Sequence, residues 1–186
     1  MATRLDTDER RQQLLDLGLE LFDRHSYESL SIEAIASEAG ISKGLLYHYF
    51  PGKRAFYVAV VESAASMLLE RAAAASEEAD QLPDTTPLER MVAGVDAYLD
   101  FAETYADSFR FVLRAKDEEV QPILQSVRRH FIDRLLEEGG NPLGAVGLIA
   151  FAEGVTLEWL DAPEAWKRED ILALIVRVAA PALGPA

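Results

Sequence analysis

This sequence of 186 residues contains no cysteine, which excludes disulfide bonds and thiolate metal ligands and fits a reducing cytoplasm. Its three histidines, His25, His48 and His130, lie far apart and lack the spacing of a zinc site. We find no glycine-rich phosphate loop, nucleophile elbow or His-Glu-x-x-His motif. We therefore expect no catalytic residues, no metal and no cofactor.

Long apolar runs are also missing. The longest uninterrupted one, from Pro142 to Ala152, is shorter than the roughly 20 residues that cross a bilayer. The segment from Arg4 to Arg11 is charged and does not resemble a secretory signal peptide. These features predict a cytoplasmic protein with no membrane partner.

Positive charge is scarce, since 18 lysines and arginines stand against 32 aspartates and glutamates for a net charge of −14. The deficit is uneven: residues 1–54 carry a net charge of −2 and residues 55–186 carry −12. The acidity is compatible with solubility alone. It also leaves room for a local basic surface near the N-terminus, whose candidates are Arg4, Arg10, Arg11, Lys43, Lys53 and Arg54.

Apolar residues recur at helical spacing along almost the whole chain, and no alternating strand pattern is present. The sequence therefore predicts an all-α protein of about nine helices. Their approximate ranges are Thr7–His25, 32–39, 43–50, 53–76, 88–102, Asp107–Arg114, Glu118–Glu138, Pro142–Leu160 and Pro163–Ala180. We expect a three-helix N-terminal head over residues 1–52 and a helical body over residues 53–186.

Residues 31–53 form the most informative segment. Ser31 and Ser42 are suited to cap two short helices, because their hydroxyl oxygens accept hydrogen bonds from free backbone amides. Gly40 between them supplies the left-handed residue that ends the first helix. Two helices joined by a short glycine-containing turn indicate a helix-turn-helix motif.

The second of these helices carries side chains suited to a DNA groove. Lys43 and Tyr47 lie four residues apart, as do Gly44 and His48, so these four residues share the face opposite Leu46. Lysine pairs with guanine, an apolar side chain contacts a thymine methyl group, and glycine allows close backbone approach. We predict that double-stranded DNA is bound by Ser31, Ser42, Lys43, Gly44, Leu45, Tyr47, His48, Tyr49 and Lys53.

The run from Ile35-Ala36 through Gly40-Ile41-Ser42-Lys43-Gly44-Leu45-Leu46-Tyr47-His48-Tyr49-Phe50-Pro51-Gly52-Lys53 closely resembles the DNA-binding signature of the TetR family of bacterial transcriptional regulators. It covers about the first third of the chain. The resemblance implies a three-helix head on a larger helical body that dimerises and binds a small effector. One departure is Leu45, where many members carry a small polar residue.

The body contains aromatic side chains that together are suited to wall an apolar cavity, the usual form of a ligand site. Each of them taken singly fits an ordinary core. A small, mainly apolar effector is predicted to contact Tyr98, Phe101, Phe109, Arg114, His130, Phe131, Phe151 and Thr156.

The last two predicted helices are apolar on nearly all sides, which indicates burial on more than one face. Small residues at positions 147, 150 and 154 allow close approach of another helix. We favour a homodimer over a monomer with a central core helix. Its predicted interface consists of Leu143, Gly147, Ala150, Gly154, Ile171, Leu174, Ile175 and Val178.

These features favour a ligand-responsive transcriptional regulator, in our interpretation a repressor. It binds a palindromic operator as a homodimer, is released by its effector, and lies on the bacterial nucleoid when bound. An alternative from another class is an all-α interaction protein that has lost DNA binding. A helical enzyme is the remote third hypothesis, because no catalytic constellation supports it.

Overall fold

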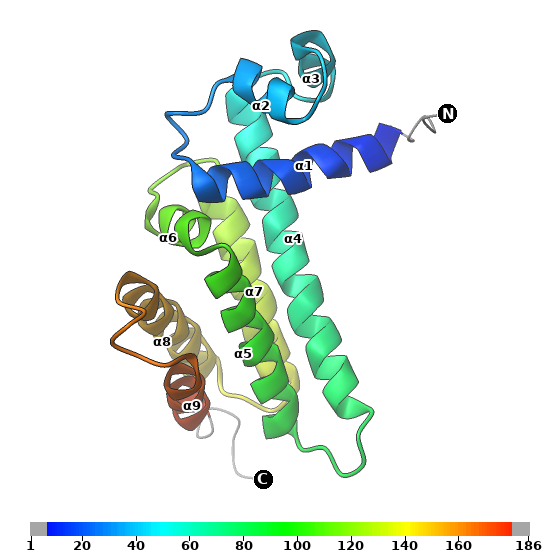
Figure 1. Cartoon of the computed structure of the whole chain (residues 1–186). Helices are drawn as coiled ribbons and strands as arrows, with labels where there is room; N and C mark the ends of the chain where they lie inside the picture. Colours follow the sequence, from blue (N-terminus) through cyan, green and yellow to red (C-terminus); the bar gives the residue numbers. More distant parts are fainter. Residues whose placement is uncertain (1–6, 180–186) are drawn as a thin grey trace.

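The computed structural model of the protein describes residues 7–179, which form nine α-helices and no β-strand (Figure 1). This confirms the predicted all-α fold. The helices are α1 (Thr7–Arg24), α2 (Ile32–Glu38), α3 (Lys43–Tyr49), α4 (Lys53–Asp80), α5 (Pro87–Thr104), α6 (Ala106–Arg114), α7 (Gln121–Glu137), α8 (Pro142–Asp161) and α9 (Arg168–Ala179).

Helix α9 begins later than the sequence predicted, at Arg168 instead of Pro163. The intervening residues form turns, in which the Ala165 amide donates to the Ala162 carbonyl over 2.9 Å. The predicted last residue of this helix, Ala180, lies outside the described residues.

Helix α7 also begins later, at Gln121 instead of Glu118. The reason is a side chain that competes for the backbone. The Asp117 carboxylate accepts hydrogen bonds from the amides of Glu119 and Val120, at 3.0 and 3.2 Å. Short polar side chains often hold the backbone in such a turn before a helix.

Helix α1 lies across the upper part of α4 and carries the two short helices of the head (Figure 1). Gly18 makes this crossing close, because a Cβ atom at this position would lie 2.5 Å from Val60 Cγ2 and 2.6 Å from Phe56 Cζ. From the other side, Ile35 and Leu46 are fully buried in the same core. The head therefore packs closely on α4 at this crossing.

The predicted boundary after residue 52 cuts through this hydrophobic core. Phe56, Tyr57, Val60 and Val61 of α4 are buried in one cluster with the head residues. The first turns of α4 thus belong to the packing unit of the head, although α4 continues far into the body (Figure 1).

The body is a bundle in which α5 packs along α4, and α8 and α9 cover its outer side (Figure 1). Leu99 of α5 is fully buried in a second core with Leu148 and Trp159 of α8 and Ile175 of α9. A capping box at Thr86 begins α5. The two cores place the DNA-binding candidate at one end of α4 and the effector candidates farther along it.

Candidate functional site

The helix-turn-helix forms as its sequence predicts. The Ser31 hydroxyl accepts a hydrogen bond from the Ala34 amide at 3.1 Å, and the Ser42 hydroxyl accepts one from the Leu45 amide at 3.2 Å. Gly40 adopts a left-handed φ of +64°. Both serines are exposed, and the cap uses only the acceptor oxygen, so the Ser42 hydroxyl proton is free to bind a phosphate. The Ser31 hydroxyl also interacts with the Glu33 carboxylate.

The outer face of α3 is open to solvent at the end of the molecule farthest from the body (Figure 1). Leu45 and Tyr47 are large side chains with exposed fractions of 39% and 44%. Leu46 is fully buried behind them and Phe50 nearly so. The helix is therefore fixed from its inner side while its outer side is left without a partner.

On this face Lys43 forms an ion pair with Glu33 of α2, and its ammonium lies 5.6 Å from the centroid of the Tyr47 ring. The hydrogen bond from the Lys43 ammonium to the Glu33 carboxylate lowers the pKa of Glu33 and raises the pKa of Lys43. Both side chains remain substantially exposed. The sequence analysis missed Glu33, because nothing in the spacing of residues 33 and 43 shows that α2 and α3 bring them together.

The structure gives Lys53 a different role from the predicted phosphate contact. Its ammonium donates to the carbonyls of Tyr27 and Leu30, at 2.8 and 2.9 Å, and lies 4.2 Å from the Tyr27 ring centroid. Lys53 therefore holds the connection between α1 and α2 against α4. Tyr49 is also half-buried, with its ring against His48 at 5.5 Å.

Most of the predicted basic candidates are also engaged within the protein. Arg54 hydrogen-bonds to Asp117 and Glu119 in the connection between α6 and α7, and these bonds raise its pKa. The guanidinium of Arg11 lies 5.3 Å from the Phe50 ring centroid. Arg4 lies outside the described residues. Among the described candidates, Arg11 and Lys43 are exposed, and Lys43 is the one that belongs to α3.

The body contains two apolar cavities that meet at Tyr98, Val127 and Glu153. The smaller one has a volume of about 150 Å³ and lies among α4, α5, α7 and α8. The larger one has a volume of about 330 Å³, and we call it the junction cavity because its walls include α1 of the head as well as α4, α5, α6 and α7.

The predicted effector residues divide between these cavities. Phe101 and Phe109 line the junction cavity, whereas His130 and Phe131 line the smaller one; Tyr98 lines both. The other three predicted residues line neither: Arg114 pairs with Asp161, Phe151 packs in the second core, and Thr156 is fully buried. Arg114 lies on α6, and Phe151 and Thr156 lie on α8; both helices contribute other residues to the cavity walls.

Half of α8 faces outward. Leu143 is 83% exposed, and Gly147, Ala150 and Gly154 follow it along the same exposed stripe. Among the described residues, α8 is the one helix with the length and composition of a membrane span, and 28% of its most apolar window is buried. An apolar helix so little covered by its own chain is suited to a partner helix.

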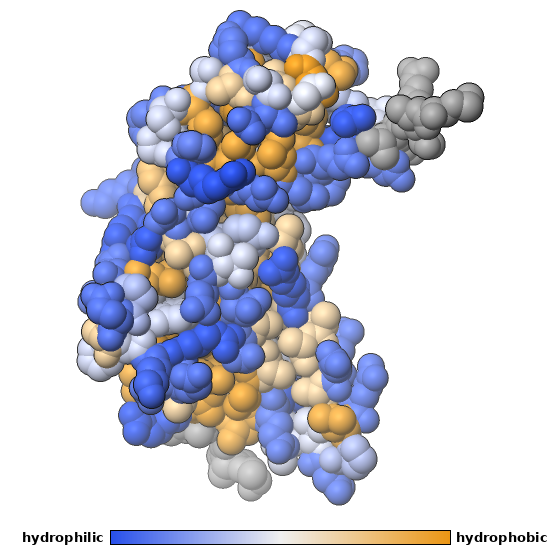
Figure 2. Space-filling model, in the orientation of Figure 1, coloured by the Kyte–Doolittle hydropathy of each residue, from blue (hydrophilic) through white to orange (hydrophobic). Residues whose placement is uncertain are grey.

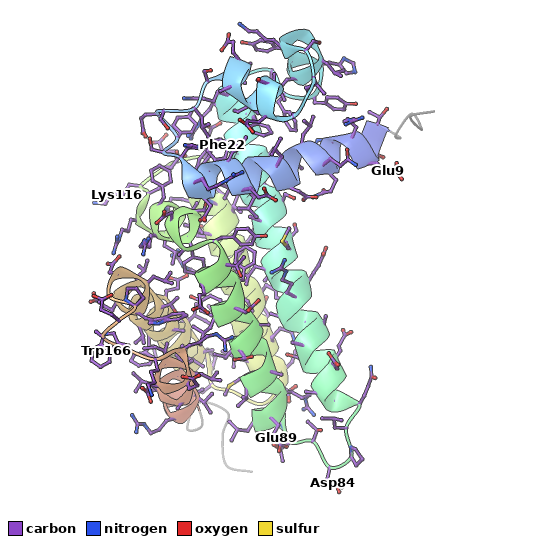
Figure 3. The ribbon with its side chains drawn as sticks, viewed as in Figure 1. Glu9, Phe22, Asp84, Glu89, Lys116 and Trp166 are labelled. Carbon is purple, nitrogen blue, oxygen red and sulfur yellow. The ribbon has the colours of Figure 1, made fainter. Side chains whose placement is uncertain are left out.

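On α9, Val178 is exposed and Leu174 is half-buried. The prediction was wrong for Ile171 and Ile175, which are 5% and 1% exposed because they pack inward against the second core. Trp166, which the sequence analysis left out, is 55% exposed and projects outward from the connection before α9 (Figure 3). Apolar surface is also visible around α9 in the space-filling view (Figure 2).

Comparison with known proteins agrees with this geometry. Residues 14–60 match the family of bacterial regulatory proteins described as the tetR family. A solved tetR-family transcriptional regulator from Streptomyces coelicolor is 30% identical, with a TM-score of 0.75, over 94% of this chain and 78% of that one.

Two named relatives match over shorter stretches. The transcriptional activator FasR of Mycolicibacterium smegmatis is 34% identical over 60% of this chain and 48% of FasR. The transcriptional repressor KstR of Rhodococcus jostii is 36% identical over 45% of this chain and 36% of KstR. The chain thus spans about half the length of FasR and about a third of KstR.

Proposed function

We infer the following function from the premise that this chain belongs to the TetR family of bacterial transcriptional regulators, whose members are not enzymes. We propose that it binds a palindromic operator as a homodimer and represses transcription until a small, mainly apolar effector releases it. Membership of this family supports a cytoplasmic location, and in our proposal the protein lies on the nucleoid while bound to its operator.

The exposed face of α3 is the observation that carries the DNA-binding proposal. Lys43, Gly44, Leu45 and Tyr47 present a cation, an open backbone and two large side chains around a fixed helix. The N-terminal residues of the second helix of such a motif reach base edges, while neighbouring groups contact phosphates. Ser31, Ser42, His48 and Tyr49 are suited to phosphates; Lys53 is less suited, because two of the three N–H donors of its ammonium are already bonded within the protein.

Selection of genomic DNA fragments by the purified protein tests this proposal. We expect enrichment of a palindromic sequence, with weaker binding by Lys43→Ala, which removes a base contact typically worth about 1–3 kcal/mol. Tyr47→Ala should weaken binding to all sequences alike. An enriched sequence with unchanged affinity for both variants would mean that another face contacts DNA. No enriched sequence would favour the interaction-protein hypothesis.

The homodimer proposal depends on the outward stripe of α8. Its residues Leu143, Gly147, Ala150 and Gly154 are exposed, and no heavy atom lies within 4 Å of a Cβ built at either glycine. A second copy of α8 can therefore approach closely along this stripe. Leu174 and Val178 extend the apolar surface onto α9, whereas Ile171 and Ile175 only support it from within.

Two matched substitutions test the homodimer. Ala150→Arg places a charge in the proposed interface, whereas Ala74→Arg makes the same change at an exposed alanine of α4. At micromolar concentration, light scattering should give a dimer for the wild type and for Ala74→Arg, and a monomer for Ala150→Arg. A monomeric wild type, or a dimeric Ala150→Arg variant, would contradict the proposed interface.

Release by an effector requires a connection between the body and the head, and α4 provides it. Arg54 at the start of α4 is bonded to Asp117 and Glu119, so a movement of the α6–α7 connection acts directly on α4. Two heads that bind successive major grooves must lie about 34–36 Å apart. A ligand that tilts α4 changes this spacing, and a coupling of about 1–3 kcal/mol would release the operator roughly 5–150-fold.

A further inference from the structure

The junction cavity is large enough for an effector, whereas the smaller cavity is not. Ligand sites usually enclose about 300–1,000 Å³. The junction cavity, at about 330 Å³, falls within this range, and the smaller one, at about 150 Å³, falls below it. This size criterion separates two cavities that are otherwise similarly apolar.

The junction cavity is also where unsatisfied polar groups gather. Within residues 7–179, the hydroxyls of Tyr57 and Ser108 are buried without a hydrogen-bond partner, and both residues line this cavity and not the smaller one. Tyr98 lines both cavities, and its hydroxyl interacts with that of Thr156. A buried polar group without a partner typically costs about 1–3 kcal/mol, so a ligand that reaches these hydroxyls recovers part of that cost. Two such groups around one cavity indicate a ligand with hydrogen-bonding atoms.

The charged groups of the cavity wall do not call for a charged ligand. The four aspartate, glutamate and arginine side chains that line it all have partners already. These are Asp23 with the Ser108 amide, Arg24 with Glu20, Asp107 with Arg110, and Glu153 with Arg128. A ligand with a formal charge would have to compete with these existing pairs for a counter-ion, which is unfavourable. His25, which also lines the cavity, is exposed.

The position of the cavity gives the ligand direct access to the head. Leu19 and Phe22 of α1 form part of its wall, and Phe22 lies in the half of α1 nearest to the body (Figure 3). The Asp23 carboxylate accepts a hydrogen bond from the Ser108 amide at 3.0 Å, which joins α1 to the start of α6. A molecule in the cavity therefore contacts the head and this joint at once.

We propose that the junction cavity is the effector site and that it takes an uncharged, mainly apolar molecule with at least one hydrogen-bonding group. The bound molecule contacts α1 of the head itself, in addition to any effect that it transmits along α4. This inference rests on the proposed function only where it calls the bound molecule an effector, because binding in the cavity is measured without DNA.

The test uses Prodan, an uncharged naphthalene dye whose ketone accepts hydrogen bonds and whose emission shifts in an apolar site. Ala64 and Ala73 are half-buried alanines of α4, and Ala64 lines only the junction cavity while Ala73 lines only the smaller one. Ala64→Phe should weaken dye binding by about tenfold or more, equivalent to about 1.4 kcal/mol. Ala73→Phe should leave the affinity for the dye nearly unchanged. If Ala73→Phe weakens binding more than Ala64→Phe does, or if the wild-type protein does not bind the dye, the junction cavity is not the effector site.

A second pair of variants avoids any change in packing. Tyr57→Phe and Ser108→Ala remove hydroxyls that have no partner in the free protein, so the fold should tolerate them. Each should weaken dye binding by about 2- to 12-fold, the range that corresponds to loss of one neutral hydrogen bond. Unchanged affinity in both would show that these hydroxyls do not recognise the ligand.

Hydrogen exchange of the DNA-free protein tests contact with the head. Bound dye should slow exchange of the backbone amides from Leu19 to Arg24, and protection confined to α4, α5, α7 and α8 would contradict a contact with α1. A protein that binds Prodan in this way but enriches no operator would refute the proposed function and leave the site intact. A protein that binds an operator but not the dye would refute the site alone.

Discussion

Substitution of Gly18 by alanine tests the close crossing of α1 and α4 on which the head depends. A Cβ at this position would lie 2.5 Å from Val60 Cγ2 and 2.6 Å from Phe56 Cζ, and both of these side chains are themselves almost fully buried. Neither can move aside without disturbing the core. Overpacking of this kind usually costs about 1–3 kcal/mol, whereas alanine regains up to about 1 kcal/mol of helix propensity.

We therefore expect Gly18→Ala to lower the free energy of unfolding by about 1 kcal/mol, and the melting temperature by about 2–4 °C for a chain of this size. Urea unfolding followed by circular dichroism, at one fixed protein concentration, measures the change. Gly44→Ala is the control, because the nearest atom to its Cβ is 4.0 Å away and α3 is exposed there. If Gly18→Ala is as stable as Gly44→Ala, the close crossing does not exist.

Three further changes separate structural from DNA-contacting charges. Lys53→Met removes two hydrogen bonds from a charged ammonium to backbone carbonyls, so the free energy of unfolding measured in urea should fall by about 1.5–3 kcal/mol. The salt dependence of operator binding should stay unchanged. Asp117→Asn should lower the free energy of unfolding at neutral pH, because the hydrogen bond from Arg54 lowers the pKa of this carboxyl. The difference from wild type should shrink as the pH falls below about 4, where the unfolded carboxyl takes up its proton, and vanish only below the lowered pKa of the folded carboxyl; a constant difference down to pH 2 would contradict this assignment. Glu33→Gln frees Lys43 from its ion pair, so the logarithm of the operator binding constant should fall more steeply with the logarithm of salt concentration, by up to about one ion. Selectivity for the operator over other DNA should become poorer, and an unchanged slope in anisotropy titrations would show that Lys43 does not approach a phosphate.

The local features of the head were predictable because they depend on neighbours in the sequence. The caps at Ser31 and Ser42 involve amides three residues away, and Gly40 adopts its left-handed conformation because it has no Cβ atom. The burial of Leu46 and the exposure of Tyr47 follow from the period of the helix. The sequence therefore sufficed to identify the motif, its family and the outward face of α3.

Side chains whose partners are distant in the sequence were predicted less well. Lys53 was expected at a phosphate, but the fold places the carbonyls of Tyr27 and Leu30 within its reach. Ile171 and Ile175 were expected at a dimer interface, but the turn before α9 directs them into the protomer core. In each case the residue type was right for either role, and only the packing of helices decided between them.

The sequence by itself determined which segments are helices, where the head motif begins and ends, and which of its faces is polar, since these depend on residues within a few positions of one another. Tertiary structure alone decided the pairing of Lys43 with Glu33, the tie between Arg54 and Asp117, and the cavity between α1 and α6. A cavity is the space left by side chains from several helices, so its volume and its unpaired hydroxyls depend on how the helices pack together and not on any local pattern.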